Sequence, residues 1–146
     1  MVGCILTGHG AFADGVGSAL EMIAGPQLAF ERVVFDEGEE AIFPDKLAHA
    51  VTDMLASFGE AVIFCDLIGG TPFNQAMLIA ATNPGVRVVT GANLPMLLEC
   101  MSLRSDGATA AELVDCAIEI GRSGIAAPVL DGATSPDSSD DDEEGI

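Results

Sequence analysis

The stretch Cys4-Ile-Leu-Thr-Gly-His-Gly10 decides the fold. An apolar run over residues 2–6 predicts a buried strand, which ends where a histidine stands between two glycines. A helical pattern follows from Phe12. Because ligands of open α/β sheets bind beyond the carboxyl ends of the strands, we take His9 as the centre of a candidate site.

Alternating patterns extend this start into an α/β fold with a mostly parallel open sheet of four strands and helices on both faces. The predicted strands cover residues 2–7, 29–35, 61–65 and 86–90. The predicted helices cover residues 12–24, 44–58, 72–82, 94–104 and 110 to about 121–124. The polar centre of the second strand suggests a sheet edge, and the fully apolar third strand suggests a central position.

Residue types at the helix starts predict their caps. Thr71 can cap the third helix with Pro72 in its first position, and Asn93 can cap the fourth. The pattern Thr109-Ala-Ala-Glu112 is typical of a capping box. Residues 125–130 are apolar enough to form a last short strand.

Length and charge bound the domain and its partners. The 146 residues predict a single domain over 1–130, followed by an acidic tail over 131–146. Acidic residues number 23 against 5 basic ones, for a net charge of −18. This balance argues against nucleic acid or an anionic membrane as a partner. It is compatible either with solubility alone or with attraction to proteins that carry basic faces.

The sequence carries no signature of a metal site, a nucleotide site or a membrane span. The four cysteines, Cys4, Cys65, Cys100 and Cys116, are widely spaced and form no metal-binding pattern, and Cys4 and Cys65 are predicted to be buried. No Walker-type loop or GxGxxG motif is present, so we expect no metal and no cofactor. No apolar run reaches the roughly 18 residues needed to span a membrane, and the N-terminus lacks a basic region. We expect a cytoplasmic protein without a signal peptide.

Two further strand ends supply possible partners for His9. Asp66 follows the third strand, and a carboxylate that accepts a hydrogen bond from one ring nitrogen leaves the other free as a nucleophile. Gly69, Gly70 and Thr71 precede or begin a helix, where backbone N–H groups suit a phosphate. Together they predict an anion held beside a nucleophilic imidazole, with Gly10 leaving room for its approach.

These motifs resemble the IIA component of the mannose family of the bacterial phosphoenolpyruvate-dependent sugar phosphotransferase system. Residues 7–10 resemble the phosphorylation-site motif of that family, and residues 66–74 and 91–99 resemble its second and third signatures. Residues 6–13 and the C-terminal Glu-Glu-Gly-Ile look most like the N-acetylgalactosamine/galactosamine-type proteins.

The resemblance implies a function for each motif. His9 would accept a phosphoryl group from the phosphocarrier HPr and pass it to a IIB protein, which serves IIC/IID membrane components. Asp66 would orient the ring, and Gly10, Gly69, Gly70 and Thr71 would contribute to the phosphoryl site. The resemblance also implies a homodimer that exchanges a C-terminal strand, for which residues 125–130 are the candidate.

Two alternatives stay open, together with the role of the second histidine. A related domain phosphorylates a dihydroxyacetone kinase subunit, but that group usually has a serine where this chain has Gly10. A non-catalytic binding module would need neither His9 nor Asp66. His49 lies in the middle of a predicted helix on a polar face, which predicts a surface residue.

Overall fold

Four parallel strands form one open sheet at the centre of the molecule. The computed structural model describes residues 1–131. The strand order is β2-β1-β3-β4, with every neighbouring pair parallel. The strands are β1 (Gly3–His9), β2 (Phe30–Phe35), β3 (Ala61–Cys65) and β4 (Val86–Val89). The predicted fold class is confirmed, including the edge position of β2 and the interior position of β3.

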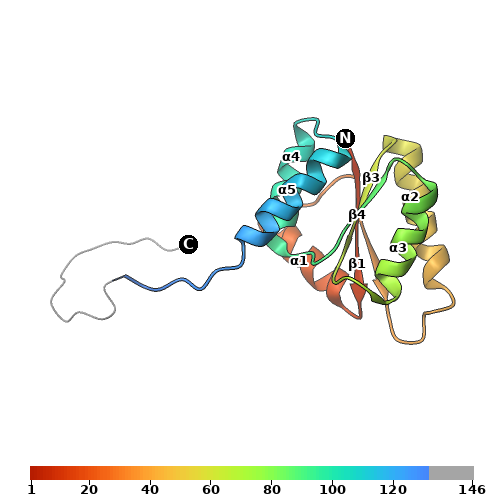
Figure 1. The fold of residues 1–146 in the computed structure, drawn as a ribbon, viewed down its shortest axis with the longest axis horizontal. Coiled ribbons are helices and arrows are strands. Elements are labelled where there is room, and N and C mark those ends of the chain that lie inside the picture. Colours follow the sequence, from red (N-terminus) through yellow and green to blue (C-terminus); the bar gives the residue numbers. More distant parts are fainter. Residues whose placement is uncertain (132–146) are drawn as a thin grey trace.

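Five helices cover the two faces of this sheet. They are α1 (Phe12–Ala24), α2 (Phe43–Phe58), α3 (Gly70–Thr82), α4 (Leu94–Ser105) and α5 (Ala110–Ser123). Helices α1, α4 and α5 lie on one face, and α2 and α3 lie on the other (Figure 1). The chain therefore winds first from β1 to β2 and then back across β1 to β3 and β4. This reversal makes the carboxyl ends of β1 and β3 the switch point at which a ligand crevice is expected.

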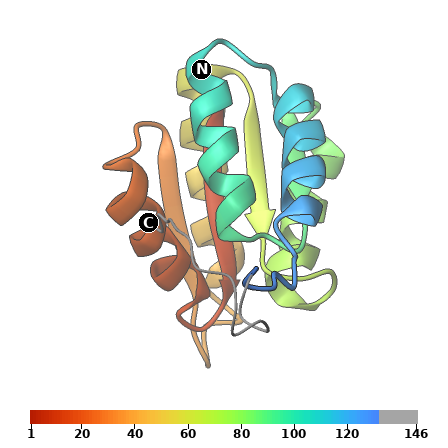
Figure 2. The same cartoon turned by 90° about the vertical axis from the view of Figure 1, so that its left-hand side faces the viewer.

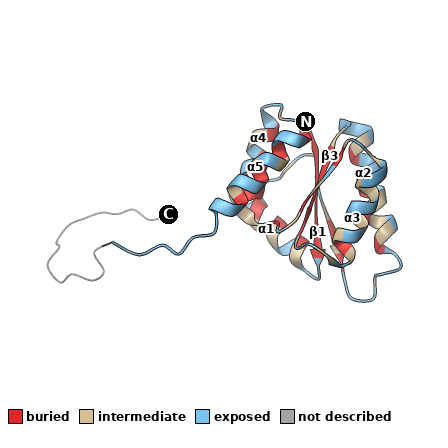
Figure 3. Ribbon diagram, in the orientation of Figure 1, coloured by how far each residue is buried: buried red, intermediate tan, exposed pale blue. Residues whose placement is uncertain are grey.

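The core consists of two apolar layers, one on each side of the sheet. Leu6 and Phe64 pack toward α1, α4 and α5, whereas Ile5 and Ile63 pack toward α2. All four side chains are fully buried. Strands covered on both faces need apolar residues at successive positions, which explains why their sequences are runs rather than alternations. Figures 2 and 3 show the layered arrangement and the buried strands within it.

Two of the three predicted caps are confirmed. Asn93 accepts a hydrogen bond from the backbone of Met96, and Thr109 and Glu112 form a capping box. The predicted cap at Thr71 is wrong, because α3 already begins at Gly70 and its capping position is Gly69. Gly69 and Gly70 have φ values of 85° and 80°, so the turn into the helix is made by two glycines in a left-handed conformation.

The last predicted strand does not form within this chain. Residues 125–130 contain no strand, and Ile125, Val129 and Leu130 are about four-fifths exposed. The segment leads away from the body of the molecule (Figure 1), and within residues 1–131 it joins none of the four strands of the sheet. The predicted acidic tail lies outside the described residues, apart from Asp131. No helix among residues 1–131 combines the length and the apolar composition needed to cross a membrane.

Candidate functional site

His9 and Asp66 meet where β1 and β3 end side by side. The two strands pair in register as far as Thr7 and Cys65, so the next residues of each strand stay adjacent. His9 is the last residue of β1, two residues beyond the predicted strand, and Asp66 directly follows β3. The sequence placed both residues at strand ends, and the parallel pairing brings their side chains together.

The Asp66 carboxylate holds both the backbone and the ring of His9. Its Oδ2 atom lies 2.8 Å from Nδ1 of His9 and accepts the backbone N–H of His9 at 2.9 Å. Its Oδ1 atom accepts the backbone N–H of Leu67 at 2.9 Å. Partial burial raises the pKa of Asp66, but these hydrogen bonds outweigh it and hold the pKa below the ordinary value.

This arrangement fixes the tautomer of the imidazole. An ionised carboxylate can only accept hydrogen bonds, so Nδ1 of His9 carries the proton that it donates to Asp66. The other ring nitrogen, Nε2, then keeps its lone pair. The His9 side chain is 46% exposed, whereas that of Asp66 is 11% exposed. The site thus presents Nε2 as an accessible nucleophile, on a ring whose opposite nitrogen is held by Asp66.

The free side of the ring faces the start of α3. A Cβ atom built on Gly70 would lie 2.9 Å from Cε1 and 3.1 Å from Nε2 of His9. The N-terminus of this helix presents backbone N–H groups and the positive end of the helix dipole, which both favour an anion. The Thr71 hydroxyl does not cap the helix. An anion attached to or approaching Nε2 would therefore meet polar donors on α3.

Two other glycines shape the site in ways that the sequence did not indicate. A Cβ atom on Gly8 would come within 2.8 Å of Cβ of Asp66 and 2.6 Å of the Phe12 ring, so only glycine lets the carboxylate approach. Gly10 has a φ of 57°, and its backbone N–H donates to the carbonyl of Phe35 at 2.8 Å. This N–H is occupied, so Gly10 offers no free donor to an anion.

Sequence reasoning missed one residue of the site. The ring of Phe35, the last residue of β2, lies with its centroid 5.8 Å from that of the His9 ring, at an interplanar angle of 78°. In the sequence, Phe35 is one more apolar residue of a predicted strand. The signal that could have found it is the parallel register, which pairs the last residue of β1 with the last residue of β2.

The other candidate residues lie away from this site. His49 is a surface residue as predicted, with a side chain 81% exposed and its Nε2 atom 3.5 Å from Asp53. Cys4 and Cys65 are buried as predicted, and burial raises the pKa of their thiols to about 11 and about 12. Within the described part of the chain, no three His, Cys, Asp or Glu side chains form a group that could hold a metal ion.

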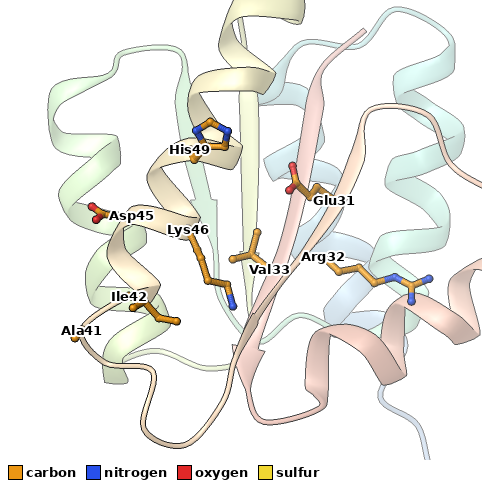
Figure 4. Close-up of a pocket in the computed structure, with 8 residues that line it drawn as sticks. All are labelled: Glu31, Arg32, Val33, Ala41, Ile42, Asp45, Lys46 and His49. Atoms are coloured by element: carbon orange, nitrogen blue, oxygen red, sulfur yellow. The ribbon is translucent and has the colours of Figure 1, made fainter.

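A hollow of about 630 Å³ lies between β2 and α2, and none of its lining residues belongs to the site around His9. Figure 4 shows Lys46 reaching from α2 toward the strand. Its Nζ atom donates to the Val34 carbonyl at 2.8 Å and to Glu39 at 2.9 Å. Arg32, which also lines the hollow, pairs with Glu21 at 2.8 Å. Since both cations already have partners, the hollow does not offer a prepared anion site.

Comparison with known proteins agrees with this geometry. Residues 3–118 match the EIIA-man family model, described as the PTS system fructose IIA component. The chain therefore belongs to the EIIA family of the phosphotransferase system, in its mannose-type branch.

Individual relatives support the same assignment. The chain is 31% identical to the mannose-specific EIIAB component of Escherichia coli K12 over 139 residues, which cover 92% of this chain and 43% of that protein. It is 36% identical to the sorbose-specific EIIA component of Klebsiella pneumoniae, over 68% of this chain and 72% of the relative. A crystal structure of an EIIA component from Streptococcus agalactiae superposes with a TM-score of 0.76 at 32% identity, covering 87% and 97% of the two chains.

Proposed function

We propose that this chain is a phosphoryl carrier in which Nε2 of His9 accepts a phosphoryl group from phospho-HPr and passes it to a IIB protein. The observation that supports this most directly is the 2.8 Å contact between Nδ1 and Asp66, which leaves Nε2 free beside the start of α3. A carrier needs a nucleophile of this kind and a product that is easily discharged.

The transfer step balances without a cofactor. The lone pair of Nε2 attacks phosphorus, and the bond between phosphorus and the donor imidazole nitrogen breaks, leaving its electron pair on the donor ring. The His9 ring then carries the phosphoryl group on Nε2 and a proton on Nδ1, so it is cationic. Asp66 compensates this charge at 2.8 Å, as carboxylates do for imidazolium in other nucleophilic sites. Transfer to IIB is the same step in reverse.

Backbone groups at the start of α3 hold the phosphoryl oxygens. We assign this role to the region of Gly69, Gly70 and Thr71, with the Thr71 hydroxyl as an additional donor. Neither Lys46 nor Arg104 adds a clamp in the proposed site, since Lys46 pairs with Glu39 and Arg104 donates to backbone carbonyls in the core. A modest hold of this kind suits a group that must leave again.

The partners and the cellular setting belong to the same proposal. HPr and IIB would dock at the exposed His9 edge, and IIC/IID would be served indirectly in the membrane. The carrier would act in the cytoplasm, with residues 1–130 as its working domain and the acidic tail as an appendage. Motif likeness favours N-acetylgalactosamine or galactosamine as the sugar, and the relatives named above differ among themselves in their sugars.

A homodimer with exchanged C-terminal strands completes the proposal. Residues 125–130 are apolar and exposed in the single chain, as a segment that pairs elsewhere would be. A hollow of about 410 Å³ lies beside the edge strand β4 and α5, lined in part by Val89, Ile118 and Ile125. A partner's segment laid along β4 would bury apolar surface on both chains and pair the free strand edge.

One phosphorylation assay tests the carrier function. The chain is incubated with phosphoenolpyruvate, enzyme I and HPr, and its intact mass is followed. We expect one acid-labile phosphoryl group on the wild type and on His49→Ala, and none on His9→Ala. The His49 variant is a matched control, because it removes the only other histidine of the chain. A wild type that stays unmodified would exclude the carrier function, and a phosphorylated His9→Ala would exclude the site.

A further inference from the structure

The imidazole of His9 is held on two sides by two different strands. Asp66, which directly follows β3, holds Nδ1, and the ring of Phe35, at the end of β2, lies beside the imidazole with centroids 5.8 Å apart. A single hydrogen bond fixes one atom of a ring but leaves the ring free to tilt about that atom. The aromatic contact restricts this tilt, because the edge of one ring meets the face of the other in a preferred geometry.

Phe35 is itself firmly placed. Its side chain is nearly buried, at 8% exposure, and its ring meets that of Phe43 in a second edge-to-face contact with centroids 4.9 Å apart. Phe43 begins α2 and is fully buried. The backbone of Phe35 is fixed as well, since its carbonyl accepts the N–H of Gly10. A rigid path thus runs from the start of α2 through two rings to the imidazole.

We propose that Phe35 is a positioning residue for phosphoryl transfer, which keeps Nε2 of His9 directed at the start of α3. This inference rests on the proposed carrier function. Nε2 lies beside Gly70, so we assign Phe35 a role in orienting the ring and not in binding the phosphoryl group. Its effect is orientation, and misplacement of a reacting group by about 1 Å can cost a hundredfold in rate.

The test compares two Phe→Leu variants on the same strand. Phe35→Leu removes the ring beside His9, and Phe30→Leu removes a half-buried ring at the other end of β2. We expect Phe35→Leu to lower the maximal rate of transfer from phospho-HPr about tenfold while the half-saturating concentration of phospho-HPr changes less than about twofold. Phe30→Leu should keep the wild-type rate, although both variants can lower Tm.

A second variant at position 35 separates the effect of the aromatic ring from the effect of side-chain volume. Phe35→Met keeps an apolar side chain of comparable length but replaces a rigid ring by a flexible chain. We expect its transfer rate to stay impaired. A wild-type rate in Phe35→Met would overturn the positioning role of the ring, and so would a wild-type rate in Phe35→Leu.

A readout on the free protein keeps this inference distinct from the carrier function. NMR relaxation and nitrogen shifts of His9 report the mobility and the tautomer of its ring without any partner protein. We expect the ring to be ordered in the wild type and in Phe30→Leu, and mobile in Phe35→Leu. An unchanged His9 ring in Phe35→Leu would overturn the inference. Absence of transfer by a wild type with an ordered ring would instead count against the carrier function alone.

Discussion

Gly70 lies so close to His9 that a Cβ atom on it would stand 3.1 Å from Nε2 of the imidazole. This relationship joins the two parts of the proposed site, because Gly70 is the first residue of α3 and Nε2 is the ring nitrogen that Asp66 does not contact. Position 70 thus favours glycine for two reasons: the backbone has a φ of 80°, and the space beside the His9 ring leaves no room for a side chain.

Gly70→Ala should separate activity from stability. The added methyl group displaces the imidazole or the incoming phosphoryl group, so we expect transfer to fall about a hundredfold or more. The positive φ adds a folding cost of about 1–2 kcal/mol. Gly59→Ala is the matched control, since Gly59 also has a φ of 80° but has open space around a Cβ atom. Stopped-flow transfer rates and urea unfolding would measure both effects, and equal rates in the two variants would refute the steric argument.

Asp66→Asn should slow transfer while the fold persists. A single Oδ2 atom of Asp66 accepts from both the backbone and the ring of His9, and the carboxylate accepts a third hydrogen bond from Leu67. An amide cannot satisfy all three donors, and its NH₂ group favours the tautomer with the proton on Nε2. We expect a loss of roughly ten- to a hundredfold in the transfer rate, the size seen when carboxylates that orient metal-bound histidines are replaced. A rate equal to wild type would remove Asp66 from the mechanism.

The contribution of Asp66 to stability should disappear in acid. The hydrogen bonds from His9 and Leu67 outweigh burial and hold its pKa below the ordinary value of 3.8. A carboxyl group with a lowered folded-state pKa stabilises the fold fully above its unfolded-state pKa, and that stabilisation is lost as pH falls through the folded-state value. We expect the gap in free energy of unfolding between wild type and Asp66→Asn to be steady near neutral pH and to shrink below about pH 4.

Urea titrations across this pH range would measure the gap directly. Asp53→Asn is a suitable control, because Asp53 is an exposed carboxylate whose described ion-pair contact is to the surface residue His49. The difference in free energy of unfolding between Asp53→Asn and wild type should stay small at every pH. A difference in free energy of unfolding between Asp66→Asn and wild type that persists unchanged into strong acid would contradict the lowered pKa of Asp66.

The parts of this fold that the sequence predicted are those set by local patterns. Apolar stretches, interrupted by polar residues in β2 and β4, predicted the four strands, and the capping box at Thr109 and Glu112 marked the start of α5. The parallel sheet then led us to expect His9 and Asp66 near each other, since both stand at carboxyl ends of strands along one edge. These features depend on residue type and spacing within one segment, or on a topological rule.

The parts that escaped prediction depend on contacts between distant segments. Phe35 acquires its relation to His9 only through the register of β1 and β2. Arg104 is an arginine in the last turn of α4, yet it is buried, and its guanidinium donates to the carbonyls of Val2 and Ala29. Thr71 does not cap α3, because Gly69 and Gly70, both with positive φ, already form the turn into that helix. No periodicity within a single segment carries this information.

The segment 125–130 leads to the last prediction, which concerns assembly. If these residues pair along β4 of a second chain, the protein of residues 1–146 should sediment as a dimer. Val129→Asp combined with Leu130→Asp should shift it toward the monomer, because the two charges would have to be buried against a partner's sheet edge. Analytical ultracentrifugation over a range of concentrations measures this shift.

Met22→Asp, at an apolar side chain that is 90% exposed elsewhere on the surface, should leave the dimer intact. A wild type that remains monomeric at every concentration, or a double variant that dimerises as the wild type does, would show that the exposed apolar segment does not hold two chains together.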